Sequence, residues 1–258
     1  MTLQLLVAAV NREPEELAEE MRIDSDAVIV SQGDHYRYEE LAWRGHRLRF
    51  FSMAERGVGL SRNFSLQRAD ADVVLFADED IIYEPDYAKT VLEAFAAHPE
   101  ADMLLFNVQA MPGRETYRND SFGRVRWYNC GRYPTYSFAA RLRRLHEENI
   151  TFSLLFGGGA KYSNGEDSLF LRDCLRAGLR VYKIPVNIGH EKVRESTWFT
   201  GYHEKFFYDR GVLYRYLYGG MARLMALRFL LAHRKTICCE IPWKKAYRIM
   251  KRGIKPAA

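Results

Sequence analysis

Short apolar runs alternate with segments of helical pattern, and this alternation restricts the fold more than any other feature of the chain. Leu3–Val10 is a continuous run rich in β-forming residues. The acidic segment that follows opens at Pro14, where a proline costs little because the first amides of a helix have no partner. The same patterns predict further strands at 27–31, 49–53, 72–77, 101–108 and 180–185, and helices at 38–43, 61–69, 86–98, 139–148 and 168–177. Such alternation predicts an α/β fold, with a mostly parallel central sheet flanked by helices and ligands bound beyond the carboxyl ends of the strands.

The length of 258 residues allows one sizeable core, with or without a small appendage. Hydrophobic residues make up 48% and charged residues 28%, which excludes the disordered, collagen-like and disulfide-scaffold classes. The four cysteines, at 130, 174, 238 and 239, form no CxxC pair and no zinc-finger spacing, so we expect no zinc site. We expect the protein to reside in a reducing cytoplasm. The amino-terminal run lacks the basic flank of a signal peptide, and no apolar run approaches the ~20 residues of a membrane-spanning helix.

The charge is distributed unevenly along the chain. The net charge is +5, yet residues 221–258 contain ten Lys and Arg residues against Glu240 alone, which is +9, so residues 1–220 carry −4. Apolar residues recur at helical spacing in this basic segment: Leu224, Leu227, Leu230, Leu231, Trp243, Tyr247 and Met250. Such a basic amphipathic tail either binds an anionic membrane surface or packs on the domain with its charges in solvent. Nucleic acid fits less well, because no nucleic-acid-binding motif accompanies the charge.

A first acidic cluster, Asp78-Glu79-Asp80, directly follows the apolar run 72–77. Two carboxylates at a strand end suit Mg²⁺ or Mn²⁺, which keep open positions for substrate phosphates. The alternative is a loop of solvated charges.

A second cluster, Asn164-Gly165-Glu166-Asp167, opens a helix next to a glycine-rich stretch at 157–159. The functional interpretation is a general base, because a carboxylate in a cleft accepts a proton from a hydroxyl. The alternative is capping of the helix N-terminus, worth ~0.3–1 kcal/mol. His190, in a predicted loop, is either a structural histidine or a metal ligand that joins Asp78 and Asp80.

The segment 56–63 combines glycines, which permit close backbone approach to a ligand, with arginines that pair with phosphate. It lacks the Gly-Lys-[Ser/Thr] ending of a Walker loop, and it is no GxGxxG fingerprint after the first strand.

Four motifs in a set order carry a resemblance to a known family. They are Leu-Val-Ala-Ala-Val-Asn-Arg-Glu at 6–13, Arg-Gly-Val-Gly-Leu-Ser-Arg-Asn at 56–63, Leu-Phe-Ala-Asp-Glu-Asp at 75–80 and Gly-Glu-Asp-Ser-Leu-Phe-Leu at 165–171. In order and spacing they resemble the family 2 glycosyltransferases with the GT-A fold, over roughly residues 3–200. The third looks like that family's DxD element and the fourth like its Glu-Asp element. With this resemblance we expect a domain over 1–215, with a nucleotide-binding half at 1–108 and an acceptor-binding half at 109–215. The charge and apolar spacing described above predict a basic helical tail at 216–258.

The resemblance also implies roles for individual residues. Asp80 would bind the Mn²⁺ or Mg²⁺ ion that bridges the donor diphosphate, with Asp78 on the ribose or the ion and His190 on the metal or diphosphate. Asp167 would deprotonate the acceptor hydroxyl in a single displacement with inversion at the anomeric carbon. The residues expected to bind the substrates are Asn11, Gln32, Arg62, Asn63, Asp78, Gly158, Gly159 and Glu166.

Two segments depart from the family pattern. Residues 8–11 are Ala-Ala-Val-Asn where Pro-Thr-Tyr-Asn is common, and residues 31–34 are Ser-Gln-Gly-Asp where Asp-Asp-Gly-Ser is common. Because both segments ordinarily contact the base, UDP is only the favoured nucleotide. We expect a surface-polysaccharide or lipid-linked glycan acceptor and a cytoplasmic enzyme, held at the inner membrane face if the tail binds lipid. The alternatives are a non-catalytic nucleotide-sugar or glycan-binding protein and a nucleotidyltransferase.

Overall fold

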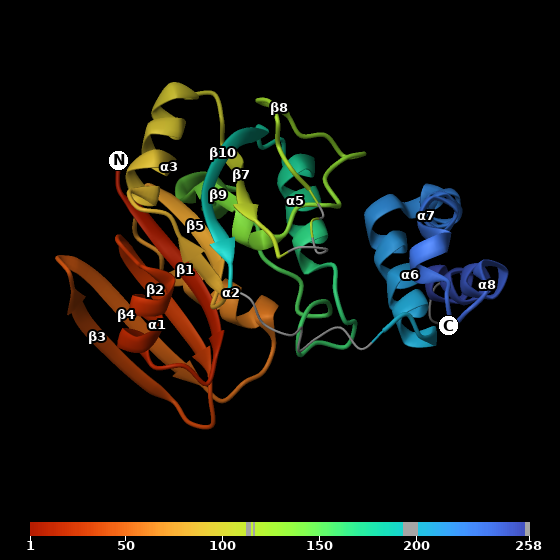
Figure 1. Ribbon diagram of the computed structural model, residues 1–258, viewed down its shortest axis with the longest axis horizontal. Coiled ribbons are helices and arrows are strands. Elements are labelled where there is room, and N and C mark those ends of the chain that lie inside the picture. The colour runs from red at the N-terminus through yellow and green to blue at the C-terminus, as the bar shows by residue number, and fades with distance from the viewer. Residues whose placement is uncertain (112–114, 116, 193–200, 256–258) are drawn as a thin grey trace.

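β1 (Leu3–Val10) is a central strand of the sheet and pairs parallel with β2 (Asp26–Gln32) on one side and β5 (Val73–Asp78) on the other (Figure 1). The computed structural model describes residues 1–111, 115, 117–192 and 201–255. The sheet order is β3-β4-β2-β1-β5-β9-β7-β10-β6, and β8 (Gly123–Arg124) pairs with β10. Residues 3–9 are all buried, because helices cover both faces of the sheet at β1. The α/β fold expected from the sequence is therefore confirmed.

The sheet is mixed in direction. β4 (His46–Met53), β2, β1 and β5 run parallel, and so do β7 (Met103–Gln109) and β10 (Val181–Glu191). The antiparallel strand β9 (Phe138–Arg141) lies between these two groups and pairs with β5 and β7. It follows that β5 and β7 point the same way, so their carboxyl ends lie at one edge of the sheet. The short strand β6 (Ile81–Tyr83) pairs antiparallel with β10.

The prediction of a helix at 38–43 is wrong. This segment is the strand β3 (Arg37–Trp43), which pairs antiparallel with β4. Arg44 and Gly45 have φ angles of 48° and 88° and close a two-residue hairpin turn between Trp43 and His46. The turn chemistry and the alternating burial of β3 decide for a strand over the helical spacing of a few residues.

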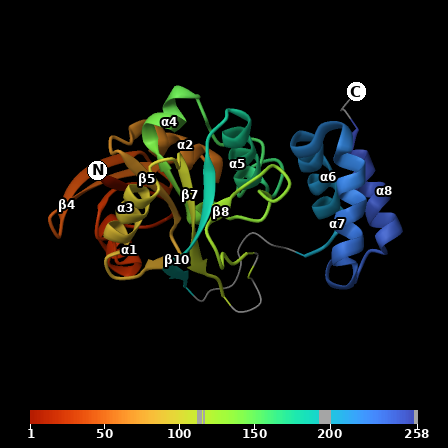
Figure 2. The same cartoon turned by 90° about the horizontal axis from the view of Figure 1, so that it is seen from above.

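Helices cover both faces of the sheet (Figure 2). One face packs against α1 (Pro14–Met21) and α3 (Tyr87–Ala97), and the opposite face packs against α2 (Val58–Arg68), α4 (Leu142–Glu147) and α5 (Glu166–Arg176). Alternate residues of β1 serve the two cores: Leu5 and Val7 lie in the first, and Leu6 in the second. A 3₁₀ turn, Thr135–Ser137, precedes β9.

The carboxyl-terminal part forms a helical unit whose core also includes Phe156 and Leu169 of the preceding part. α6 (Glu204–Tyr218), the 3₁₀ turn Gly219–Met221, α7 (Ala222–Ile237) and α8 (Trp243–Ile254) pack together. A Cβ atom on Gly211 would lie 2.2 Å from the Met250 carbonyl oxygen, so the glycine lets α6 and α8 approach closely.

The expected boundary between 215 and 216 falls inside α6, so the helical unit begins earlier than the sequence predicts. The acceptor-binding half expected at 109–215 includes 112–114, 116 and 193–200, and the tail includes 256–258, which lie outside the described residues. Within the described ranges, every helix is too short or too polar to cross a bilayer.

Candidate active site

The carboxyl end of β5 carries the first acidic cluster. Asp78 is the last residue of the strand and is about one-third exposed. The Glu79 carboxylate accepts a hydrogen bond from the Val10 amide at 3.2 Å, and the Asp80 carbonyl accepts one from the Lys192 amide at 2.7 Å. The cluster is thereby attached to the ends of β1 and β10, as the rule for ligand sites in α/β sheets predicts.

Arg62 joins this cluster to the second acidic cluster. Its guanidinium, which is 4% exposed, lies on α2 and donates to Asp78 Oδ1 at 2.6 Å and to Glu166 Oε1 at 3.0 Å. The ring of Phe152 lies under the guanidinium, 5.4 Å from centroid to Cζ. Arg62 therefore brings together side chains that are 16 and 104 residues away in the sequence. The sequence predicts phosphate as the partner of this arginine; in the structure its partners are two carboxylates.

Glu166 and Asp167 lie in the first turn of α5. Gly165, at the N-cap with φ 115°, donates its amide to Glu166 Oε2 at 3.1 Å, and the Ser168 amide donates to Asp167 Oδ1 at 2.6 Å. Both acids thus accept a hydrogen bond from the backbone amide of a sequence neighbour, although α5 has no side-chain cap, and Glu166 in addition reaches the buried arginine of another helix. Capping alone does not account for that second contact.

The surroundings of Asp167 favour its neutral, protonated form. Burial and the neighbouring Glu166 carboxylate raise its pKa to about 7, while the Ser168 amide and the charges of Arg62 and Arg210 oppose the rise. A carboxylate with a pKa near the working pH is well suited to accept a proton. The Arg210 charge comes from α6, so the helical unit influences the candidate base.

The glycine stretch supports the site by backbone packing. The Gly158 carbonyl accepts a hydrogen bond from the Val58 amide at 2.9 Å, at the start of α2. A Cβ atom on Gly159 would lie 3.1 Å from the Gly57 nitrogen, and one on Gly157 would lie 2.8 Å from Glu166 Cδ. These glycines allow the loop to touch the backbone at the start of α2 and the side chain of Glu166. Gly158 and Gly159, expected to bind substrate, thus contact the backbone at Val58 and Gly57.

The amide side chains near the site fix its loops. Gln32 Oε1 accepts the Gly57 amide at 2.9 Å, and the Gln32 carbonyl accepts the Asn11 amide at 3.0 Å. Asn63 binds the backbone of Phe152 twice, donating to its carbonyl at 2.9 Å and accepting from its amide at 2.6 Å. Asn63 therefore positions the aromatic ring under Arg62. Phe152 carries no motif that would have singled it out in the sequence.

The expected metal set of Asp78, Asp80 and His190 does not form a preassembled three-ligand site. Among the described residues, no three His, Cys, Asp or Glu side chains gather as a metal site. His190 lies within β10, not in a loop, and its Nδ1 atom is 3.6 Å from Glu84 Oε1. Asp78 and Asp80 fit a divalent ion when substrate phosphates complete its oxygen ligands, which is the usual arrangement for Mg²⁺.

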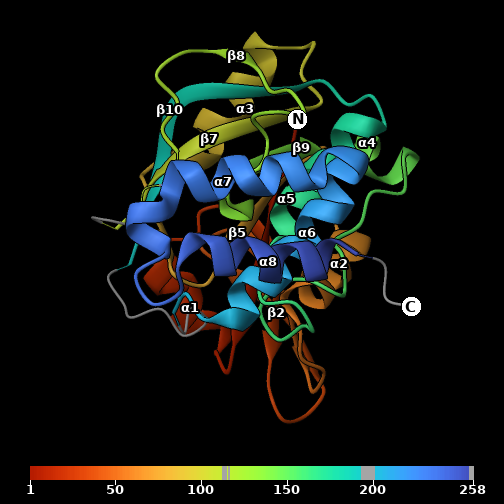
Figure 3. The ribbon, with the colours of Figure 1, turned by 90° about the vertical axis from the view of Figure 1, so that its right-hand side faces the viewer.

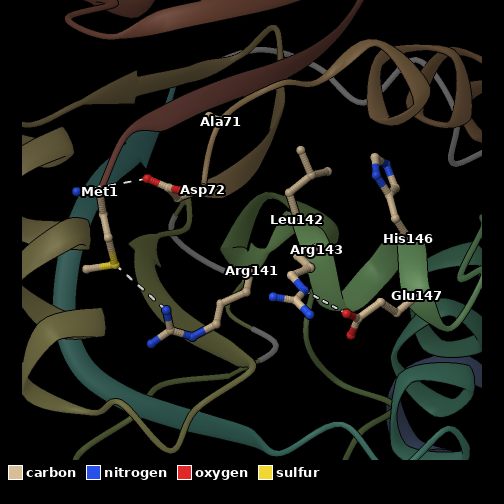
Figure 4. Close-up of a pocket in the computed structure, with 8 residues that line it drawn as sticks. All are labelled: Met1, Ala71, Asp72, Arg141, Leu142, Arg143, His146 and Glu147. Atoms are coloured by element: carbon tan, nitrogen blue, oxygen red, sulfur yellow. Dashed lines mark hydrogen bonds and ion pairs between the residues drawn. The ribbon is translucent and has the colours of Figure 1, made fainter.

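A separate hollow of about 510 Å³ lies at the other edge of the sheet (Figure 4). It opens at Met1 and Asp72, immediately before β1 and β5, and hence at the amino ends of these strands. Its other lining residues are Ala71, Arg141, Leu142, Arg143, His146 and Glu147. It is therefore distinct from the acidic clusters.

Comparison with known proteins gives a family and a fold. The family model described as "Glycosyl transferase family 2" matches residues 15–162. The solved structure of S. aureus TarS 1–349 in complex with UDP-GlcNAc is similar with a TM-score of 0.68 and 15% identity, over 99% of this chain and 82% of that one. TarS 1–349 in complex with UDP gives a TM-score of 0.61 at 15% identity, over 93% of this chain and 74% of that one. At these identities the likeness concerns the fold, and it confirms the GT-A expectation. No curated protein matches the sequence.

Proposed function

The chain belongs to glycosyl transferase family 2, and from this premise we propose that it transfers a sugar from a nucleotide sugar to a hydroxyl group of a surface-polysaccharide or lipid-linked glycan. The observation that carries the proposal is the convergence of Asp78, Arg62 and Glu166 next to Asp167, a carboxylate whose pKa is about 7. UDP is the favoured nucleotide, and the structural likeness to TarS bound to UDP-GlcNAc and to UDP supports that choice.

The proposed reaction is a single displacement at the anomeric carbon. Asp167 accepts the proton of the acceptor hydroxyl, and the acceptor oxygen forms the new bond to the anomeric carbon. The bond from that carbon to the diphosphate oxygen breaks, and the nucleoside diphosphate leaves with the electron pair. Attack from the face opposite the leaving group inverts the configuration. The protein contributes position and electrostatic stabilisation.

Arg62 has a positioning role in this scheme. It neutralises part of the negative charge of Asp78 and Glu166 and holds both carboxylates in one place. Its charge also opposes the rise in the pKa of Asp167, so that this group loses its proton near neutral pH. Asp78 and Asp80 would hold Mn²⁺ or Mg²⁺, and an ion bound there would supply positive charge where negative charge develops on the diphosphate.

The acceptor site is proposed at the carboxyl-end edge of the sheet. A hollow of about 710 Å³ lies beyond β7, on the same edge as Asp78, because β5 and β7 point the same way. Its lining includes Asn107, Gln109, Tyr117 and Asn187. Glu115 and Arg118 also line it, while the Tyr117 hydroxyl is bound to the backbone of Phe106 and Val108. Amide and charged groups of this kind can bind sugar hydroxyls, which supports a glycan acceptor.

The test is a panel of nucleotide sugars incubated with the protein, with Mn²⁺ or EDTA, in which released nucleotide is identified. We expect one nucleoside diphosphate to be released, and Asp167→Asn to lower kcat at least ~100-fold with donor affinity retained. Asp173→Asn is the matched control, because it removes a carboxylate from the same helix outside the site.

The products separate this proposal from its alternatives. Pyrophosphate release in place of nucleoside diphosphate identifies a nucleotidyltransferase. Donor binding without release, in the presence of lipid-linked and polysaccharide acceptors, identifies a binding protein. Full activity of Asp167→Asn refutes the assignment of the base.

A further inference from the structure

The helical unit presents an unusual surface on the outer sides of α7 and α8. These two helices lie side by side at the end of the molecule away from the sheet (Figures 1 and 3). Each packs one side into the core of the unit, and no described residue covers the opposite side.

α8 separates its apolar and basic residues completely. Its buried residues, Ala246, Ile249, Met250, Gly253 and Ile254, recur every three or four positions and face the unit's core. The residues on the opposite side are Lys244, Lys245, Arg248, Lys251, Arg252 and Lys255. Among these six basic residues, only Lys245 forms an ion pair with a described residue, Glu204, at 2.7 Å. Most of this positive charge therefore faces solvent uncompensated.

α7 carries leucines where an ordinary surface helix carries polar residues. Its core side is formed by Ala222, Ala226, Leu230 and Ile237. Leu224 is 64% exposed and Leu231 is 47% exposed, and they are seven residues apart, so they share the outward side. Arg228 and Lys235 follow them by four residues each and lie on that same side, both exposed. Packing within the unit does not account for the two leucines.

We propose that these outer sides of α7 and α8, termed here the basic–leucine face, dock on an anionic lipid membrane surface. Leucines among lysines and arginines match the interface of a bilayer, where apolar side chains enter below the headgroups and long basic side chains reach the phosphates. A nucleic acid would be bound by the charge alone and gives the exposed leucines no role. A second copy of the chain would bring two uncompensated basic surfaces together, which charge repulsion opposes.

This inference is independent of the proposed function, because vesicle binding is measured without donor or turnover. Co-sedimentation of the full chain with vesicles of phosphatidylcholine containing about one-third phosphatidylglycerol, against pure phosphatidylcholine, tests it. We expect binding to the anionic vesicles that weakens as salt is raised. Replacing Arg228, Lys235, Lys244 and Arg248 by Gln should weaken binding by up to ~1,000-fold, because each residue contributes about 1 kcal/mol of attraction to the surface.

Matched controls separate this face from general charge. Replacing Arg22, Arg124, Arg126 and Arg176 by Gln removes the same charge from exposed positions outside α7 and α8, and binding should stay within about twofold of wild type. Leu224→Ser with Leu231→Ser should weaken binding ~10-fold even at low salt, while Leu154→Ser with Leu155→Ser, equally exposed, should not. If the four-Gln variant fails to fold, the leucine pair and the salt titration of the wild type still decide.

Three results overturn the proposal. The first is equal binding to neutral and anionic vesicles. The second is anionic binding that the four-Gln and leucine variants leave intact. The third is the absence of vesicle binding. In that case sedimentation velocity would show whether the leucines hold a dimer, and a binding assay would show whether the basic residues bind duplex RNA.

Discussion

The guanidinium of Arg62 donates to the carboxylate of Glu166 at 3.0 Å, and through this bond the start of α5 is tied to the middle of α2. The same guanidinium donates to Asp78 at the end of β5. Two acidic clusters of like charge are thereby held on either side of one buried cation. This arrangement gives the neighbouring Asp167 a defined place and a defined electrostatic environment.

We predict that the pH dependence of activity follows Asp167. Its pKa is about 7, so kcat/KM should rise with pH toward a plateau above neutrality as the carboxylate becomes the base. The control is Asp173→Asn, which should keep the wild-type profile. A profile that is flat from pH 5 to 8 would contradict the assignment.

The carboxyl group of Asp167 should make the free energy of unfolding fall as pH rises. The folded pKa of Asp167 lies above the value of 3.8 for an unperturbed aspartate, so between about pH 4 and 7 the folded state holds a proton that the unfolded state has released. This stabilising contribution is complete below pH 4 and is lost as pH rises through 7. Asp167→Asn should therefore exceed wild type in stability by a larger margin at pH 8 than at pH 5, because the amide carries no charge at either pH. Thermal unfolding at both pH values measures the difference.

Arg62→Met should destabilise the fold by about 3–5 kcal/mol, because Asp78 and Glu166 lose the buried charge that pairs them. Urea unfolding measures the change. Arg47→Met, which breaks an exposed pair with Asp70, is the control and should cost less than about 1 kcal/mol. Equal stability of the two variants would argue against a structural role for the Arg62 bridge.

Asp80→Ala should remove the Mn²⁺ dependence of donor binding, measured by calorimetry with and without EDTA. His190→Ala should retain that dependence, because the described structure places His190 beside Glu84 and in no three-ligand group. Loss of metal dependence in the histidine variant alone would reverse these assignments.

Gly211→Ala should destabilise the helical unit, because the added Cβ would lie 2.2 Å from the Met250 carbonyl oxygen. We expect a loss of about 1–3 kcal/mol, visible in hydrogen exchange of α6 and α8. Gly220→Ala, where a Cβ meets nothing within 4 Å, is the control. Unchanged exchange in the Gly211 variant would mean that the two helices can move apart at little cost.

The sequence by itself determined the elements that depend on local spacing. The run at Leu3–Val10, the proline-led helix after it and the acidic end of β5 are all where apolar periodicity and strand ends predict them. Asp167, the candidate base, could also be singled out from the sequence, because an acidic pair after a glycine-rich stretch is a local signal.

Only the tertiary structure decided which distant groups meet. Glu166 and Asp78 lie 104 and 16 residues from Arg62, and nothing local to any of them encodes that they share it. The hairpin at Arg44 and the burial of part of the basic tail as a three-helix unit depend likewise on pairing and packing between segments. The local spacing of apolar residues determines whether a segment forms a helix or a strand. Which other segment it packs against is decided by the free energy of the whole packed chain.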